Sequence, residues 1–234
     1  MKGILYGVSV GPGDPELITL KAVKTIKSCD VIAVPRASSE HDLTAYSIAK
    51  SAIPEIDKCK VIELYMPMTR NKEELELART NAVNKLIELL RAGKNVAFLT
   101  LGDVSIYSTY SYLHKTVQAK GFTDKMVAGV PSFCAAASSL GESLTDAHLP
   151  LHIVPASYQG VEQELDYTGT KILMKTGKSF ASVKAKLKER GLLRYAKMVQ
   201  RCGMDGECIY QSLEDVENPS DYFSIIIVKD WEGC

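Results

Sequence analysis

The sequence predicts an α/β protein built from two domains, and three observations support this. In the first half of the chain, short β-rich runs alternate with longer amphipathic segments, which is typical of a largely parallel sheet covered by helices. In the second half, fewer helical segments separate the strands, which predicts a mixed sheet. The pattern changes near residues 116–126. We therefore expect an N-terminal α/β domain over residues 1–120 and a C-terminal α/β domain over residues 121–234.

Hydrophobic periodicity and helix boundary signals define the elements of the first domain. Strands are expected at residues 4–10, 30–35, 60–65 and 95–101, and helices at residues 16–28, 43–53, 73–92 and 108–121. Asp14 and Pro15 provide an N-cap and a first-turn proline for the first helix, and Gly93 ends the third.

The second domain is expected to begin with an apolar run at residues 127–130. Strands are predicted at residues 151–155, 171–175, 198–202, 207–211 and 222–229, and helices at residues 133–140 and 179–190. Gly191 ends the last of these helices.

Composition excludes several functional classes. The chain is 46% hydrophobic and 24% charged, which is ordinary for a soluble globular protein. Lys plus Arg and Asp plus Glu are equal at 28 each, so no basic field is present to bind nucleic acid. No run approaches the roughly 18 apolar residues of a membrane span. We expect a cytoplasmic protein without nucleic-acid or membrane partners.

The cysteine and histidine positions do not predict a metal centre. The six cysteines lack C-x-x-C spacing and are expected to be reduced; they are Cys29, Cys59, Cys134, Cys202, Cys208 and Cys234. His148 and His152 are four residues apart, but Pro150 between them would break a helix. We therefore expect no protein-bound metal.

The first chemically informative segment is G-x-S-x-G-P-G-D-P at residues 7–15, between a predicted strand and a helix. A dinucleotide-binding loop would suit a nicotinamide-dependent oxidoreductase, but Glu16 replaces its third glycine. Asp14 at the N-cap would repel a phosphate, and the next strand leads into Arg36 instead of an acidic residue. Two interpretations stay open: a tight turn, and a loop whose backbone approaches a bulky ligand.

The second segment, residues 99–113, is an apolar strand that stops at a Gly-Asp pair. Ligands of open α/β sheets bind beyond the carboxyl ends of parallel strands, so Asp103 is the best placed carboxylate. Its alternative role is to cap the helix that follows. Tyr107, Tyr110 and Tyr112 come next. One or two of them are expected to pack in the core, and an aromatic side chain near a cleft could lie against a flat macrocycle.

The third segment, residues 128–141, has the sequence AGVPSFCAAASSLG. Its small side chains permit close approach of a ligand or, alternatively, close packing of a helix on a sheet. Ser132, at the expected helix start, is the better ligand contact.

These segments, in this order, resemble the tetrapyrrole methylase family. GPGDPELITLKA at residues 11–22, LGDVSIYSTYSYLH at 101–114 and AGVPSFCAAA at 128–137 are similar to the branch that methylates C-20 of precorrin-2 or its cobalt counterpart. The resemblance covers essentially the whole chain. One departure is Val104, where much of the family has proline after Gly-Asp, which changes the rigidity of the loop.

The resemblance implies a class III methyltransferase fold: two α/β domains with a cleft between them, usually as a homodimer. S-adenosylmethionine, the methyl donor, is expected to lie folded in the cleft. Its implied contacts are Gly102, Asp103, Ile106, Ser132, Phe133, Met174, Lys175, Cys202 and Ser224. The implied tetrapyrrole contacts are Gly11, Pro12, Gly13, Tyr107 and Tyr110.

The implied activity is methyl transfer to C-20 of cobalt-factor II (cobalt-precorrin-2) or of precorrin-2 in cobalamin biosynthesis. Such a transfer needs alignment of the reactants and exclusion of water more than covalent help. Asp103 is the first candidate for electrostatic help or proton handling, and Tyr107 the second. The sequence leaves the metal state of the substrate open, although six cysteines favour the cobalt route. Methylation of a different substrate and a tetrapyrrole carrier without turnover are the alternatives.

Overall fold

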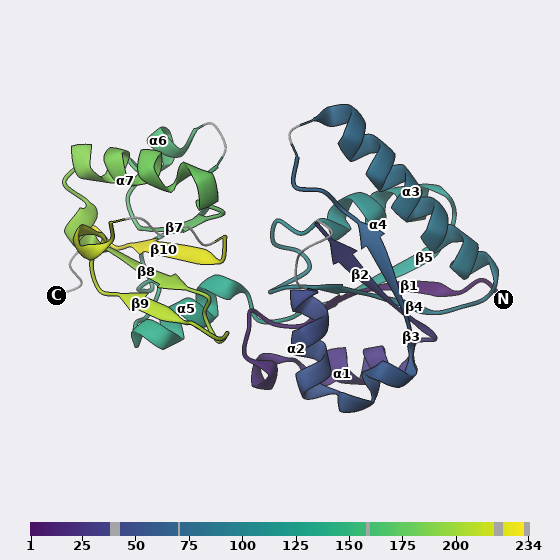
Figure 1. The fold of residues 1–234 in the computed structure, drawn as a ribbon. Coiled ribbons are helices and arrows are strands. Elements are labelled where there is room, and N and C mark those ends of the chain that lie inside the picture. The colour runs from purple at the N-terminus through teal and green to yellow at the C-terminus, as the bar shows by residue number, and fades with distance from the viewer. Residues whose placement is uncertain (38–42, 70, 158–159, 218–221, 232–234) are drawn as a thin grey trace. The chain divides into compact units, whose positions relative to one another are not determined.

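The chain folds into two compact units, Met1–Pro131 and Ser132–Cys234 (Figure 1). The computed structural model describes residues 1–37, 43–69, 71–157, 160–217 and 222–231. Each unit has its own five-stranded sheet and its own helices, which confirms the predicted α/β class.

The sheet of the first unit is parallel throughout, as predicted. Its order is β3 (Lys60–Tyr65), β2 (Val31–Arg36), β4 (Val96–Thr100), β1 (Ile4–Ser9) and β5 (Thr123–Val127). The two central strands are in register, with Val8 opposite Leu99 and Ser9 opposite Thr100. The carboxyl ends of β1 and β4 therefore finish side by side.

Two pairs of helices cover the two faces of this sheet. They are α1 (Leu20–Ser28) and α2 (Thr44–Ala52) on one face, and α3 (Lys72–Arg91) and α4 (Tyr110–Ala119) on the other (Figure 1). Leu86 and Leu90 of α3 pack with Phe98 of β4 in the core, and all three are fully buried. Burying one such side chain stabilises the fold by about 1.5–3 kcal/mol.

The start of the first helix differs from the prediction over residues 16–28. Asp14 does act as an N-cap, but it caps a short 3-10 helix, η1 (Pro15–Leu17). Thr19 then caps α1 through its own side chain. An N-cap residue has extended, non-helical backbone. Thr19 therefore interrupts the helical turns between η1 and α1 and divides the segment in two.

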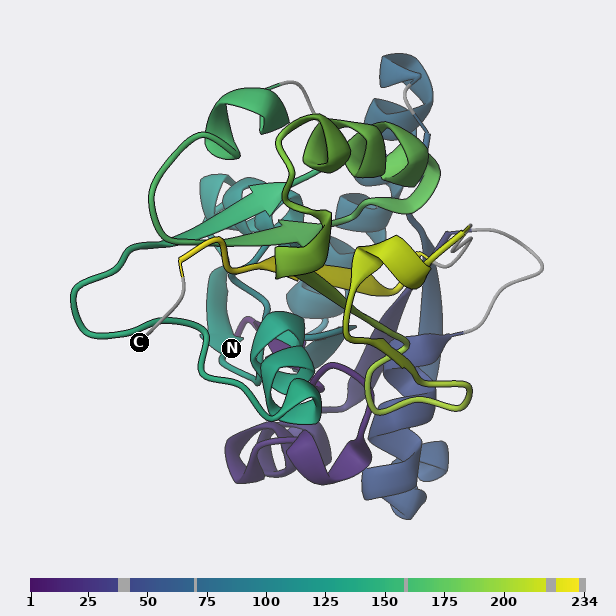
Figure 2. The ribbon, with the colours of Figure 1, turned by 90° about the vertical axis from the view of Figure 1, so that its left-hand side faces the viewer.

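The second unit has the mixed sheet that the sequence predicts. Its order is β6 (Leu151–Pro155), β7 (Thr170–Met174), β10 (Ser224–Val228), β8 (Ala196–Gln200) and β9 (Cys208–Tyr210). The β6 and β7 pair is parallel and the other pairs are antiparallel. One face carries α5 (Ser132–Leu140), and the other carries α6 (Val161–Glu164) and α7 (Phe180–Glu189) (Figures 1 and 2).

The boundary between the units lies further along the chain than residue 120. Residues 123–127 form β5, and β5 pairs with β1 in the first sheet. The first unit consequently continues to Pro131. Strand pairing, a long-range interaction, decides this boundary.

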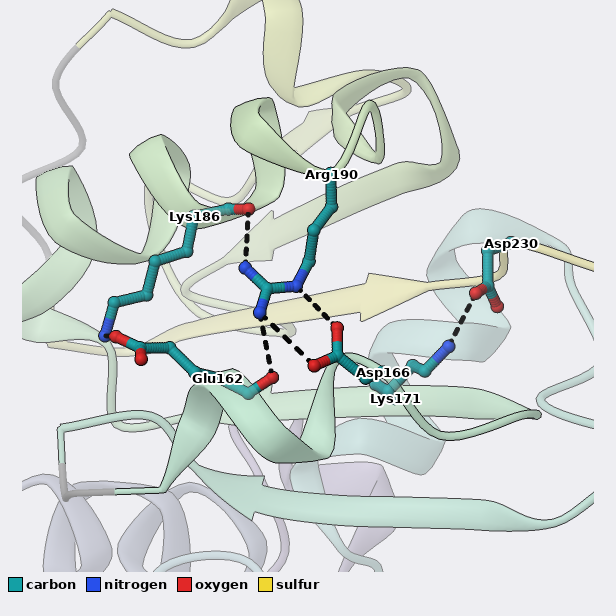
Figure 3. A network of polar contacts seen from close by, with 6 residues as sticks. All are labelled: Glu162, Asp166, Lys171, Lys186, Arg190 and Asp230. Carbon is teal, nitrogen blue, oxygen red and sulfur yellow. Dashed lines mark hydrogen bonds and ion pairs between the residues drawn. The ribbon is translucent and has the colours of Figure 1, made fainter.

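A polar network links helices and strands of the second unit. Figure 3 shows its six charged side chains: Glu162, Asp166, Lys171, Lys186, Arg190 and Asp230. The Lys171 side chain is fully buried, and its Nζ lies 2.7 Å from Oδ2 of Asp230. A buried ammonium needs such a partner, because removing one member of a buried ion pair leaves an uncompensated charge. Asp230 thereby anchors the chain after β10 to the start of β7.

The thiols Cys29, Cys59, Cys134, Cys202 and Cys208 are free, and Cys234 lies outside the described residues. Within the described ranges, no helix is both long enough and apolar enough to span a membrane.

Candidate functional site

Three loops of the first unit meet where its parallel strands end. Val10 N donates a hydrogen bond to Thr100 O at 3.0 Å, and Gly102 N donates to Gly11 O at 2.7 Å. Both glycines have left-handed backbone, with φ of 83° at Gly11 and 68° at Gly102. Such a conformation favours glycine because it has no Cβ. The first two sequence motifs are thus joined through their backbones.

Ser9 and Gly129 connect the third motif to the other two. Ser9 is fully buried, and its Oγ accepts a hydrogen bond from Val104 N at 2.8 Å. A Cβ added to Gly129 would lie 2.4 Å from the Cβ of Ser9 and 2.8 Å from the carbonyl oxygen of Gly102. Only glycine fits there, so the loop after β5 packs directly on the loops after β1 and β4.

Asp103 ties two of these loops together. Its Oδ2 accepts a hydrogen bond from Gly129 N at 2.7 Å, and its Oδ1 accepts from Ser105 N at 2.8 Å and from the Ser105 hydroxyl. The helix-capping alternative is not what the structure shows, because α4 starts at Tyr110 with Thr109 as its N-cap.

The surroundings of Asp103 keep it ionised. Burial alone would raise the pKa of this carboxyl group, but the hydrogen bonds from Ser105 and Gly129 outweigh burial and hold the pKa below its usual range. A carboxylate with a lowered pKa accepts protons poorly near neutral pH. Its geometry instead suits a fixed negative charge that orders the loop.

Tyr107 and Ile106 occupy the same loop. Ile106 is half-buried, and Tyr107 is exposed with a backbone φ of 47°. A positive φ at a residue other than glycine costs about 1–3 kcal/mol and is concentrated at functional sites. The loop holds Tyr107 in this conformation at the surface of its unit, where a ligand could contact the ring.

Tyr110 does not have the surface position expected of a substrate contact. Its side chain is fully buried, and its ring centroid lies 5.6 Å from that of Phe98. A Cβ added to Gly7 would lie 2.4 Å from Cε1 of this ring, so the glycine makes room for the tyrosine. This assignment is therefore corrected: Tyr110 is part of the core, because its large ring fills the space between α4 and the sheet.

The Gly11-Pro12-Gly13 loop is compact. All three residues are buried, and a Cβ at Gly11 would lie 3.2 Å from Leu17 O. Gly13, where the sequence predicts a positive φ, does not have one; the left-handed backbone of this turn is at Gly11.

In the second unit, topology brings three strand ends to one edge of the sheet. Because β7 and β8 both run antiparallel to β10, their carboxyl ends lie beside the start of β10, with Ile225 opposite Met174 and Ser224 opposite Gln200. Nε2 of Gln200 donates a hydrogen bond to Oγ of Ser224 at 3.3 Å. This edge collects four of the predicted donor contacts: Met174, Lys175, Cys202 and Ser224.

The backbone is strained directly after two of these strands. Lys175 follows β7 with a φ of 56°, and Arg201 follows β8 with a φ of 50°. Burial lowers the pKa of Lys175. Beside it, the Thr176 side chain is 1% exposed, and its Oγ1 has no hydrogen-bond partner among the described residues. A buried hydroxyl without a partner is costly, so this edge of the sheet holds a polar atom that can still make a hydrogen bond.

Helix α5 begins with the predicted contacts Ser132 and Phe133, of which Phe133 is buried and Ser132 is half-buried. At its other end, Oγ of Ser139 lies 3.4 Å from Sγ of Cys202. The small side chains of α5 thus serve close packing on the sheet, which was one of the two interpretations of this segment.

Sequence reasoning missed three residues of these edges. Ser9 was visible as the serine of the first motif. Thr176 and Arg201 carry no sequence signal, because neither the burial of the Thr176 hydroxyl nor the left-handed backbone of Arg201 is encoded in residue type. Among the residues that the structure describes, no three His, Cys, Asp or Glu side chains are grouped to hold a metal ion.

Residues 4–217 match the family described as Tetrapyrrole (Corrin/Porphyrin) Methylases. This chain belongs to that family. The matched range contains all five strands of the first sheet and β6 to β9 of the second. It also contains the three loops joined by Asp103 and Gly129, so these loops are part of the tetrapyrrole methylase fold.

Individual tetrapyrrole methylases differ in how much of this chain they match. The cobalt-precorrin-2 C(20)-methyltransferase of Salmonella typhimurium is 32% identical over 99% of this chain and 99% of its own. The precorrin-2 C(20)-methyltransferase of a Sinorhizobium species is 28% identical over 98% of this chain and 96% of its own. By contrast, the cobalt-precorrin-4 C(11)-methyltransferase of Methanocaldococcus jannaschii, at 35% identity, aligns with only 59% of this chain and 46% of its own.

Solved structures share the fold. A cobalt precorrin-4 methyltransferase has a TM-score of 0.75 at 21% identity, covering 96% of this chain and 94% of its own. The uroporphyrin-III C-methyltransferase of Thermus thermophilus, solved in complex with S-adenyl homocysteine, has a TM-score of 0.72 at 21% identity, covering 97% and 98%.

Proposed function

We propose that this tetrapyrrole methylase is an S-adenosylmethionine-dependent C-methyltransferase that acts on C-20 of cobalt-precorrin-2 (cobalt-factor II) or of precorrin-2 in cobalamin biosynthesis. One observation carries the proposal: similarity to relatives named for C(20) transfer runs from end to end of the chain. The relative named for C(11) transfer matches only part of it. The carbon of the tetrapyrrole that receives the methyl group is thus best assigned from the relatives that align over the full length of the chain.

We propose that the methyl donor contacts residues of both units. In the first unit these are Gly102, Asp103 and Ile106, and in the second Ser132, Phe133, Met174, Lys175, Cys202 and Ser224. The Thr176 hydroxyl, which has no partner among the described residues, and the strained backbone at Lys175 fit a polar ligand at this edge of the second sheet. When bound, S-adenosylmethionine supplies an activated methyl group. The protein must then orient the reactants and exclude water.

Within this proposal, Asp103 and Tyr107 have different roles. Asp103 acts as a fixed anion that holds the loop after β4, because its oxygens already accept hydrogen bonds from Ser105 and Gly129. Tyr107 provides an exposed phenol on that loop, which suits it to contact the macrocycle and to handle a proton. Gly11, Pro12 and Gly13 form the other proposed contact with the tetrapyrrole.

We further propose a cytoplasmic homodimer, as the family resemblance implies, with any cobalt ion bound to the substrate and not to the protein.

The decisive experiment supplies the purified protein with S-adenosylmethionine and, separately, cobalt-factor II and precorrin-2. We expect one of them to gain a single methyl group by mass spectrometry, located at C-20 by NMR. Methylation at another position would overturn the C-20 assignment. Binding of both tetrapyrroles without turnover would instead favour a carrier. Faster methylation of one of these two tetrapyrroles shows whether the natural substrate contains cobalt.

A further inference from the structure

A cavity lies in the Ser132–Cys234 unit, away from the strand ends described above. Its volume is about 210 Å³, and it is lined by Glu142, Arg194, Tyr195, Lys197, Ile227, Lys229 and Trp231. Val228 pairs with Ala196 next to this cavity, whereas Ser224 pairs with Gln200 at the other end of the same strands. The cavity therefore belongs to the opposite edge of the sheet from the proposed donor contacts.

The charges around the cavity favour an anion. Three cations and one carboxylate line it, so its formal charge at neutral pH is positive. Glu142 forms ion pairs with both lysines, and Nζ of Lys229 also donates a hydrogen bond to Ser143 O at 3.0 Å. Arg194 has no carboxylate partner within the described part of the chain, and its guanidinium lies 4.7 Å from the Tyr195 ring centroid. Arg194 is thus the cation available to a ligand.

The other walls are aromatic and apolar. Nε1 of Trp231 donates a hydrogen bond to Oγ1 of the buried Thr170 at 3.0 Å, which fixes the indole. Nζ of Lys229 lies 4.9 Å from the centroid of that ring. Ile227 adds an aliphatic surface. A flat ligand could stack on such walls while its charge meets the cations.

We propose that this cavity binds a small planar organic anion, an aromatic carboxylate of about the size of benzoate. A planar guanidinium recognises a carboxylate through two parallel hydrogen bonds, which Lys cannot match. The volume suits a single ring, because pockets for drug-sized ligands are larger, about 300–1,000 Å³. The inference is independent of the methyltransferase proposal.

The chain offers a built-in reporter, because Trp231 is its only tryptophan. Benzoate is titrated into the full-length protein at constant ionic strength, with excitation at the red edge of the indole absorption. We expect a saturable change in Trp231 fluorescence. Benzamide has the same shape as benzoate without the charge. It should bind at least about tenfold more weakly than benzoate.

Two variants separate the site from a general charge effect. Arg194 is exposed, so Arg194→Gln should fold normally while weakening benzoate binding about tenfold. Lys188→Gln removes the same charge from an exposed position of the same unit outside the cavity and should bind like the wild type. The proposal would be overturned if both variants changed benzoate binding equally, or if benzamide bound as tightly as benzoate. It would also be overturned if the fluorescence of Trp231 changed with protein concentration and not with benzoate concentration.

Discussion

The carboxylate of Asp103 lies 2.7 Å from the backbone nitrogen of Gly129, so the loop after β4 and the loop after β5 share one partly buried hydrogen bond. Residues that are 26 positions apart in the chain thereby form one structural unit. The Gly129 nitrogen needs an oxygen acceptor, and asparagine has the shape of aspartate without its charge. Replacing Asp103 with asparagine therefore tests the charge separately from the shape.

Asp103→Asn should destabilise the first unit. If the amide keeps its oxygen toward Ser105, its NH2 group faces the Gly129 N–H, and two donors cannot pair. We expect a loss of about 1–3 kcal/mol in the free energy of unfolding, measured in urea. Affinity for S-adenosylhomocysteine, measured by calorimetry, should fall as well. The exposed Asp146→Asn serves as the control and should change neither. Unchanged stability and affinity in Asp103→Asn would remove Asp103 from the site.

The pH dependence of stability should carry the signature of Asp103. Its pKa is lowered in the folded protein, so its stabilising contribution is complete above the unfolded pKa of about 3.9 and is lost as the pH falls through the folded pKa. The difference in unfolding free energy between wild type and Asp103→Asn should therefore be constant near neutral pH and shrink in acid. Urea titrations from pH 7 downward measure it. A difference that stays constant throughout would mean that the ionised form has no special role.

Thr176→Val should separate ligand binding from folding. Because Oγ1 of Thr176 has no partner among the described residues, replacing the hydroxyl with a methyl group should leave stability unchanged or raise it by up to about 1 kcal/mol. Thermal stabilisation by S-adenosylhomocysteine, which reaches about 2.7 kcal/mol at a concentration of 100 times Kd, should decrease. Melting curves with and without the ligand test this.

The matched control for that experiment is Thr170→Val. Thr170 is equally buried, but its Oγ1 accepts a hydrogen bond from Trp231, so its removal should cost about 1 kcal/mol without affecting the ligand. If Thr176→Val is destabilised like Thr170→Val and keeps its full ligand response, the Thr176 hydroxyl has a structural partner.

Gly11→Ala should affect the use of the tetrapyrrole more than the binding of the methyl donor. The left-handed backbone at this position disfavours a side chain, and the new methyl group would press on Leu17 O at 3.2 Å. We expect the displaced loop to lower kcat/KM for the tetrapyrrole about tenfold or more, while the Kd of S-adenosylhomocysteine stays within about twofold of wild type. Loss of donor affinity with tetrapyrrole use preserved would show that this loop binds the donor, and would reopen its interpretation as a nucleotide loop.

Local chemistry determined much of this protein from sequence alone. Alternating β-rich and amphipathic segments gave the parallel first sheet, and the sparser helices gave the mixed second sheet, because side-chain periodicity follows backbone geometry directly. The three motifs also indicated the tetrapyrrole methylase family, which the family match over residues 4–217 confirms.

Tertiary structure alone decided what individual polar and aromatic residues do. Tyr110 and Tyr107 are three positions apart with the same side chain, yet one is in the core and the other is exposed. The Tyr110 ring fits into the core because Gly7 of β1 has no side chain in its way. Asp103 had the sequence context of a helix cap, but the nitrogen of Gly129 lay within its reach. The partners that decide such roles come from distant strands. Their proximity results from strand pairing across the sheet, a long-range interaction that residue type and local spacing do not encode.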